Sequence, residues 1–286
     1  MPVVLVTDVL VWLLVAAAAG YAIYCRRHAH LAGPWGRVFR SPAAMASLVV
    51  LGAYVALGLL DSLHFRPALA QKADAPSAYA SEVLSVLDLG LAQLRGRGEK
   101  TYSAPLATRS YAKELIEQPD GRQLRDFPRL RFGGAQLHDE ADWAADVTQR
   151  ALGGLAVSVL LSFVVLLGTK ILKKKRPDIP WQAAGISLGA LLLLAGPAVA
   201  LSSVYHVLGT DKVGQDVFYL ALKSVRTSLV IGTVTTLVLL PVGIALGTMA
   251  GYFKGWIDDV IQYIYTTLNS IPGVLLIAAA VLMMQV

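Results

Sequence analysis

The 286-residue chain is 56% hydrophobic, only 15% charged and has a mean hydropathy of +0.59, which is typical of an integral membrane protein. Its net charge of +6 does not indicate nucleic-acid binding, because the segment from Arg66 to Arg150 is neutral, with 12 basic and 12 acidic residues. The excess charge lies mostly in short loops beside apolar runs, where it predicts membrane topology. The single cysteine, Cys25, excludes an intrachain disulfide.

The first apolar run extends from Val3 to Cys25 and contains one charged residue, Asp8. A cleavable signal peptide would carry positive charge before this run, whereas Arg26 and Arg27 follow it. We therefore expect a retained helix whose N-terminus lies outside the cytoplasm.

The loop at residues 26–40 holds four arginines and no acidic residue, so we place it in the cytoplasm. Pro42 precedes the second apolar run, Ala43–Leu60, at a position where the missing N–H costs a helix least. Residues 1–63 are thus predicted to form two transmembrane helices.

Residues 64–150 form the one sizeable water-soluble region, and we expect a partly helical insertion outside the cytoplasm. A helical period appears at 81–94, a second helix is expected at 105–118, closed by a turn at 119–121, and a third near 139–140 continues into the membrane. The insertion is too long for its basic residues to set topology. It is either a spacer or a region that binds something of its own, and both possibilities stay open.

Residues 151–204 are predicted to form two further spans, Ala151–Thr169 and Ala183–Val204. Five basic residues between Lys170 and Arg176 mark the loop between these spans as cytoplasmic. We interpret this cluster as a topological anchor in preference to a dedicated lipid-binding site. Gly196-Pro197 predicts a kink in the second of the two spans.

Residues 205–286 contain the fifth and sixth apolar runs, Leu229–Ala250 and Val260–Val286. Six spans with both ends outside the cytoplasm agree with every short-loop charge bias. The fold class is therefore all-α, a polytopic transmembrane helical protein with a soluble insertion.

A polar loop, Gly209-Thr210-Asp211-Lys-Val-Gly214-Gln-Asp216, precedes the fifth run. Its two glycines allow tight turns or turns with positive φ, and its two aspartates can cap a following helix. After it, residues 217–222 predict a short amphipathic helix at the membrane surface, before Arg226 and Ser228 begin the span.

A second turn, Gly251-Tyr252-Phe-Lys-Gly255-Trp256-Ile-Asp258-Asp259, follows the fifth run. The two glycines make the turn, and the two aspartates suit the first turn of the next helix, where negative charge opposes the helix dipole. We prefer this structural reading to a catalytic pair of carboxylates.

These elements in this order resemble the permease subunits of bacterial ABC importers for dipeptides and oligopeptides. The family pattern reads roughly HxLGTDxxGRD, SLxxG, AGYxGGxxD and then a proline-containing start of a helix. The residues that fit it are His206, Leu208, Gly209, Thr210, Asp211, Gly214, Asp216, Ser228, Leu229, Gly232, Ala250, Gly251, Tyr252, Gly255, Asp258 and Pro272. The departures from it are Gln215 for Arg, Lys254 for Gly, and Gln262, Tyr263 and Thr266 for Met, Arg and Asp.

The resemblance implies a permease subunit in the inner membrane that imports peptides or similar small solutes. It implies as partners a second permease subunit, two ATPase subunits that bind the ATP, and a substrate-binding protein outside the cytoplasm. The loop from Gly209 to Asp216 would then lie at the outer mouth of the path, near the surface where the binding protein docks. For Asp216 we prefer a purely structural role, and for Asp211 both roles stay open.

The sequence lacks the motifs of enzymes and of cofactor-binding proteins, so we expect a subunit that is not an enzyme and holds no cofactor. The sequence has no P-loop, and the centres of its apolar runs hold no ionisable residue, which argues against an ion-driven transporter. His28 and His30 have no neighbouring ligand with which to complete a metal site. His64, His138 and His206 are isolated in the sequence, and no catalytic triad can be assembled from them.

The family's cytoplasmic coupling loop does not occur before Val286. We expect a sequence cut before that loop, and the alternative is a protein that lacks it. A second hypothesis for the function is a membrane scaffold that does not transport and that uses residues 64–150 to hold a partner.

Overall fold

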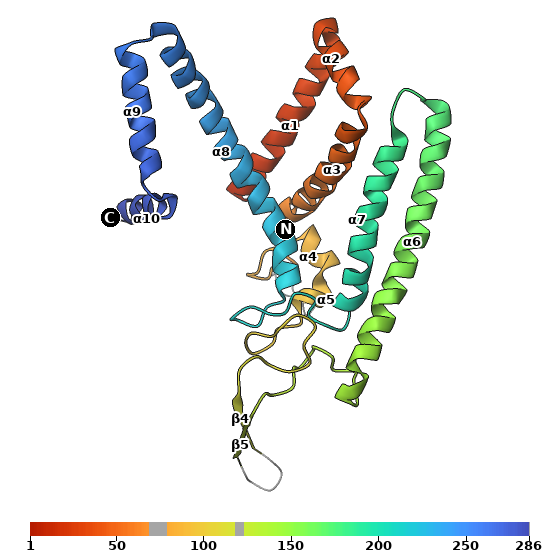
Figure 1. Ribbon diagram of the computed structural model, residues 1–286. Coiled ribbons are helices and arrows are strands. Elements are labelled where there is room, and N and C mark those ends of the chain that lie inside the picture. The colour runs from red at the N-terminus through yellow and green to blue at the C-terminus, as the bar shows by residue number, and fades with distance from the viewer. Residues whose placement is uncertain (69–78, 118–122, 286) are drawn as a thin grey trace, which may run out of the picture. The chain divides into compact units, whose positions relative to one another are not determined.

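A computed structural model describes residues 1–68, 79–117 and 123–285. It divides the chain into two compact units, residues 1–230 and 231–286 (Figure 1). The prediction of an all-α, multi-span membrane fold is confirmed, since strands are few and short.

Among the described residues, five helices are long and apolar enough to cross a membrane. They are α1 (Val6–Arg27), α3 (Pro42–Ser62), α6 (Trp143–Lys175), α7 (Trp181–Ser202) and α8 (Val217–Phe253). Each follows from an uninterrupted apolar run, as the sequence predicts.

The expected sixth span is not one straight helix. Helices α9 (Trp256–Ser270) and α10 (Gly273–Met284) meet at an angle of 93°, as a broken span or a re-entrant loop. The break falls at Ile271-Pro272, because a proline disfavours helical geometry in the residue before it. Ile271 is indeed extended, with φ −86° and ψ 126°.

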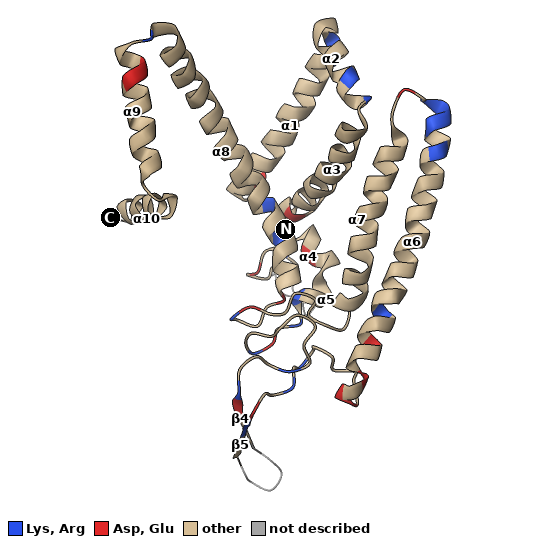
Figure 2. Cartoon of the chain, viewed as in Figure 1, with Lys and Arg blue, Asp and Glu red and all other residues tan. Residues whose placement is uncertain are grey.

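The first two spans are joined by a short helix, α2 (Ala29–Phe39). Pro42 is the first residue of α3, as expected for a proline at a helix start. Arg40 lies between α2 and α3, and its guanidinium is 3.9 Å from the carboxylate of Asp178 in the α6–α7 connection. The two basic loops of this unit therefore lie at the same end of their helices (Figure 2).

Helices α6 and α7 pack closely through small residues. A Cβ atom on Gly154 would lie 2.6 Å from the carbonyl oxygen of Gly196, so only glycine allows this approach. Ser162 Oγ donates a hydrogen bond to the carbonyl oxygen of Gly189 across the pair, at 3.2 Å. Small residues and serine hydroxyls of this kind hold helices together where no hydrophobic effect operates between them.

Two strands at the start of the insertion, β2 (His64–Phe65) and β3 (Leu84–Ser85), form a small antiparallel sheet with β1 (Pro2–Val3) at the N-terminus of the chain. Two short helices follow, α4 (Val86–Gly90) and α5 (Ala92–Arg95). The helix expected at 81–94 is therefore shorter, starts later and is interrupted. Ser85 sets its start, because its hydroxyl accepts a hydrogen bond from the Asp88 N–H at 3.1 Å.

The prediction of a helix at residues 105–118 is wrong. Residues 114–117 form β4 (Glu114–Glu117), which pairs antiparallel with β5 (Gln123–Asp126). Cross-strand pairing decides the conformation of such a short segment, and a local helical period does not reveal it. The turn expected at 119–121 lies outside the described residues.

The expected start of a helix near 139–140 is confirmed. A 3₁₀ turn, η1 (Glu140–Asp142), leads directly into α6, and Asp139 Oδ1 accepts the N–H of Ala141 at 3.1 Å. Beside this start, Tyr205 is buried against Leu137 and Leu201, and its hydroxyl donates to Asp146 Oδ2 at 2.7 Å. Burial and this carboxylate raise the pKa of Tyr205 to about 12.

The prediction of a short separate helix before the fifth span is also wrong. Residues 217–222 are not a separate surface helix, because α8 is continuous from Val217 through the apolar run. At about 1.5 Å per residue, its 37 residues make a rod of roughly 55 Å, longer than the roughly 30 Å hydrocarbon core of a bilayer.

Candidate functional site

The loop from Gly209 to Asp216 is built against the insertion. Gly209 and Gly214 have φ values of 75° and 80°, in the left-handed region that favours glycine. A Cβ atom on Gly209 would collide with the carbonyl oxygen of Ser103, and one on Gly214 with that of Glu99. The glycines therefore allow both the turn and the close backbone approach.

Thr210 is hydrogen-bonded to the same segment of the insertion, residues 99–103. Its hydroxyl donates to the carbonyl oxygen of Thr101 at 2.8 Å and lies 3.0 Å from Ser103 Oγ. The side chain is only 4% exposed. Thr210 thus faces the insertion and not the solvent.

Asp216 caps the start of α8, as its position in the sequence predicts. Its Oδ1 accepts the N–H groups of Phe218 at 2.8 Å and Tyr219 at 3.2 Å. Its Oδ2 lies 2.7 Å from Nδ1 of His206. Asp216 therefore links the helix start to the end of the preceding loop.

His206 lies between two carboxylates. Its Nε2 is 3.4 Å from Oε1 of Glu99, whose carboxylate also accepts the N–H groups of Arg131 at 2.9 Å and Phe132 at 2.7 Å. The His206 side chain is 1% exposed and that of Glu99 is 4% exposed. Both ring nitrogens therefore face carboxylate oxygens.

Asp211 is at the exposed part of the loop. Its Oδ1 accepts the N–H groups of Val213 at 2.9 Å and Gln215 at 2.8 Å, which closes the turn on itself. Lys212 and Val213 are exposed, and Val213 is 63% exposed. We call residues 211–213 the loop tip.

A second buried cluster joins α1, α3, α8 and the insertion. Arg226 of α8 contacts Asp8 Oδ1 at 2.8 Å and Asp61 Oδ2 at 3.2 Å, and both aspartates are almost fully buried. His64 Nδ1 lies 2.9 Å from Asp8 Oδ2, while its Nε2 is 3.1 Å from Arg226. These partners fit a neutral ring that carries its proton on Nδ1 and accepts from the arginine.

The cluster continues through Lys223 to Asp88. Lys223 Nζ lies 2.9 and 2.8 Å from the two carboxylate oxygens of Asp88, and the Tyr219 hydroxyl donates to Asp88 at 2.6 Å. Burial raises the pKa of Asp88, but hydrogen bonds from Lys223, Tyr219 and the Ser85 N–H outweigh burial and lower it to about 2. Asp88 is thus held as a carboxylate that anchors the insertion to α8.

The second predicted turn belongs to the other unit. Gly251 and Tyr252 are still helical, at the end of α8, and the chain turns at Lys254 and Gly255 with φ values of 50° and 60°. Tyr252 and Trp256 are 79% and 74% exposed. The structure therefore presents two aromatic side chains at this turn.

The predicted position of the paired aspartates at the turn is confirmed. Asp258 and Asp259 lie in the first turn of α9. Asp258 Oδ1 accepts from the side chain of Gln262 at 3.1 Å.

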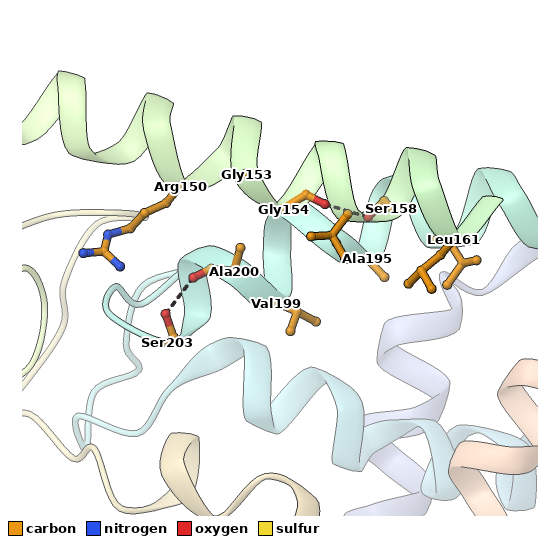
Figure 3. A pocket seen from close by; sticks show the side chains of 12 residues that line it. Arg150, Gly153, Gly154, Ser158, Leu161, Ala195, Val199, Ala200 and Ser203 are labelled. Carbon is orange, nitrogen blue, oxygen red and sulfur yellow. Dashed lines mark hydrogen bonds between the residues drawn. The ribbon is translucent and has the colours of Figure 1, made fainter. Parts of the chain in front are cut away.

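A cleft with a volume of about 610 Å³ lies on the surface of α6 and α7 (Figure 3). Its walls are mostly apolar, apart from the hydroxyls of Ser158 and Ser203 and from Arg150 at one end. Arg150 is paired with Asp146 at 2.9 Å. The cleft therefore offers no free charged group to a polar substrate.

Nothing within residues 1–68, 79–117 and 123–285 groups three or more His, Cys, Asp or Glu side chains as a metal site would need. His28 and His30 stack edge to face at 5.7 Å, and His28 Nδ1 contacts the carbonyl oxygen of Tyr24.

Sequence reasoning missed the two histidine sites. His64 and His206 were expected to be isolated, yet each contacts buried charged partners that lie far away in the sequence. One signal was available, because a charged residue inside an apolar run, such as Asp8 near one end of the first run, needs a partner. The sequence does not say which residue that partner is.

Comparisons with known proteins agree with the resemblance seen in the sequence. The chain is 42% identical over 79 residues to the glutathione transport system permease protein GsiD of Pectobacterium atrosepticum, which covers 28% of this chain and 26% of that protein. It is 30% identical over 116 residues to the oligopeptide transport system permease protein OppC of Mycobacterium bovis and of Mycobacterium tuberculosis, which covers 34% of this chain and 40% of those proteins. The matches thus span about a quarter to two fifths of these relatives. No family model and no solved structure matches the chain.

Taken together, the spans and the similarities show a multi-pass α-helical membrane protein with a segment homologous to the permease subunits of peptide ABC importers.

Proposed function

We propose that this chain is a transmembrane permease subunit of an ABC importer that moves peptides or similar small solutes across the inner membrane. The observation that carries the proposal is the 42% identity to a glutathione permease over 79 residues. The spans of the chain supply the membrane part, and separate ATPase subunits supply the energy. The chain itself has no P-loop with which to bind ATP.

The partners follow from the same similarity. A second permease subunit would complete the pathway, two ATPase subunits would bind on the cytoplasmic side, and a substrate-binding protein would deliver the solute from outside. The scaffold hypothesis has no comparable support, because the matched relatives are transport proteins by name.

The loop tip is our candidate for the contact with the binding protein. Its base is fixed by Thr210, Asp216 and the two glycines, whereas Lys212 and Val213 are free to meet a partner. A rigid base under an exposed tip lowers the entropy cost of docking, because the tip is already held in one shape.

Uptake by the complete complex tests the function. The chain is co-expressed with its ATPase, second permease and binding-protein partners and reconstituted in vesicles. An importer requires a co-purifying ATPase, ATP-dependent uptake of a labelled peptide, and loss of uptake when the ATPase is inactivated. A scaffold would be recovered without an ATPase and without uptake.

The docking assignment has its own test in the same vesicles. Val213→Asp is expected to lower the ATPase stimulation by the binding protein at least tenfold, because it places a charge in the contact. The control is Leu115→Asp on β4, which changes an equally exposed apolar residue (67% against 63%) on the insertion. Normal ATPase stimulation in Val213→Asp would rule out the loop tip as the contact with the binding protein. Loss of stimulation in Leu115→Asp alone would place that contact on the strand pair β4–β5.

A further inference from the structure

A second cleft lies where the two basic loops meet. It has a volume of about 450 Å³ and is lined from one side by Gly36, Phe39 and Arg40, and from the other by residues 175–179. This volume falls within the roughly 300–1,000 Å³ of clefts that bind small ligands. In the sequence these loops are two separate topological markers, whereas the structure joins them in one cleft.

The lining of this cleft is cationic with an apolar part. Arg40, Lys175 and Arg176 bring three positive charges, and Asp178 brings one negative charge, so the cleft carries a net charge of +2. Arg40 and Asp178 are 3.9 Å apart, and their side chains are 65% and 75% exposed, so this ion pair is weak and open to competition.

The cleft lies at the ends of helices that are long and apolar enough to cross a membrane. Arg40 stands just before Pro42, which begins the span α3, and Lys175 ends the span α6. The aromatic rings of Trp35 and Phe39 on α2 have centroids 6.2 Å apart, and tryptophan is enriched at the level of the lipid headgroups. Figure 2 shows the basic residues gathered at these helix ends.

We propose that this cleft binds the phosphate headgroup of an anionic phospholipid. The guanidinium groups of Arg40 and Arg176 suit a phosphate, because each can donate two parallel hydrogen bonds to its oxygens. Phe39 and Ile179 would contact the start of the acyl chains. Basic pockets between membrane helices bind anionic headgroups in the same way.

Lipid retention by the full chain tests the proposal. The protein is purified in detergent and mixed with phosphatidylglycerol or phosphatidylcholine, and native mass spectrometry counts the bound lipids. We expect phosphatidylglycerol to be retained over phosphatidylcholine. Arg40→Gln combined with Arg176→Gln should lower this retention at least tenfold, since each basic residue near an anionic headgroup is worth roughly fivefold in affinity.

The matched control is Lys173→Gln combined with Lys174→Gln, which removes the same charge from the same region but outside the cleft. It should change retention by less than twofold. Equal losses in both double variants would reduce the effect to diffuse attraction and overturn the proposal, as would no loss in either. Displacement by an equal concentration of inorganic phosphate would show a free-anion site and contradict the lipid assignment.

A third variant keeps the proposal testable if the double variant does not fold. Asp178→Asn keeps every cation and raises the net charge of the cleft to +3. It should increase the retention of phosphatidylglycerol, and unchanged or reduced retention would count against the site. None of these outcomes depends on transport, so the failure of this proposal leaves the proposed function untouched.

Discussion

Nδ1 of His206 lies 2.7 Å from Oδ2 of Asp216, and both side chains are 1% exposed. The contact joins the last residues before the loop to the N-terminal cap of α8. On its other side the same ring faces Glu99, which accepts backbone N–H groups of the insertion. One imidazole therefore holds together three parts of the chain: a membrane helix, a loop and the insertion.

Removing this imidazole should destabilise the insertion and the loop that packs against it. In His206→Ala the carboxylates of Asp216 and Glu99 remain buried without the group between them, and leaving a buried polar group without its hydrogen-bond partner costs about 1–3 kcal/mol. We expect a clearly lower melting temperature in detergent, measured by intrinsic fluorescence. His138→Ala, at an exposed histidine, is the control and should melt like the unchanged protein. Equal melting of the two variants would contradict the proposed link.

Gly214→Ala should be as damaging as a core mutation although it adds only one methyl group. The new Cβ would collide with the Glu99 carbonyl oxygen, and alanine disfavours the φ of 80°. We expect a destabilisation of about 3 kcal/mol. Gly98→Ala, whose Cβ would meet no atom within 4 Å, should change stability by less than about 1 kcal/mol. Limited proteolysis of the insertion would compare the two variants.

Acid should weaken the attachment of the insertion through Asp88. Because its pKa falls to about 2 in the folded state, the stabilisation that Asp88 adds is fully present above its ordinary pKa of 3.8. It is lost as the pH falls from about 4 towards 2, at a cost of about 1–2 kcal/mol. Asp88→Asn should lower stability at pH 7 and lose less of it over this range. Parallel melting curves of the two proteins between pH 5 and pH 2.5 would refute the assignment.

The orientation in the membrane can be read by thiol labelling in whole cells. In a Cys25→Ala background, a cysteine at Gly98 should react with an impermeant reagent, because the insertion is predicted to lie outside. Cysteines at Arg37 and Lys174 should stay unlabelled until the cells are opened. The reverse pattern would invalidate the orientation and the transport model that rests on it.

The membrane helices were predictable because each depends on a local property. A long apolar run by itself indicates a helix that spans a membrane. The helices α1, α3, α6 and α7 and the middle of α8 therefore match the spans predicted from the sequence. Pro42 marked the start of α3 for the same local reason. The break before α10 was not predicted, since the apolar run Val260–Val286 was read as one span although it contains Pro272.

The insertion was harder to predict because its structure depends on distant partners. Strand β4 is a strand because β5 pairs with it, and the period of its own residues does not reveal this. Likewise, the residues next to His206 in the sequence do not indicate that it contacts Glu99, which lies 107 residues away. The sequence did identify Asp216 as a cap, because its partners Phe218 and Tyr219 are its neighbours.

The close approach of Gly214 to Glu99 also limits how the protein can change. The backbones of the loop at Gly214 and of the insertion at Glu99 are in direct contact, so neither segment can be replaced without regard to the other. A chimera that carries the insertion of another protein must bring a backbone N–H to the carbonyl oxygen of Gly214, as Glu99 does, or it must acquire a different turn before α8. The two segments are therefore constrained to evolve together, although more than a hundred residues separate them in the chain.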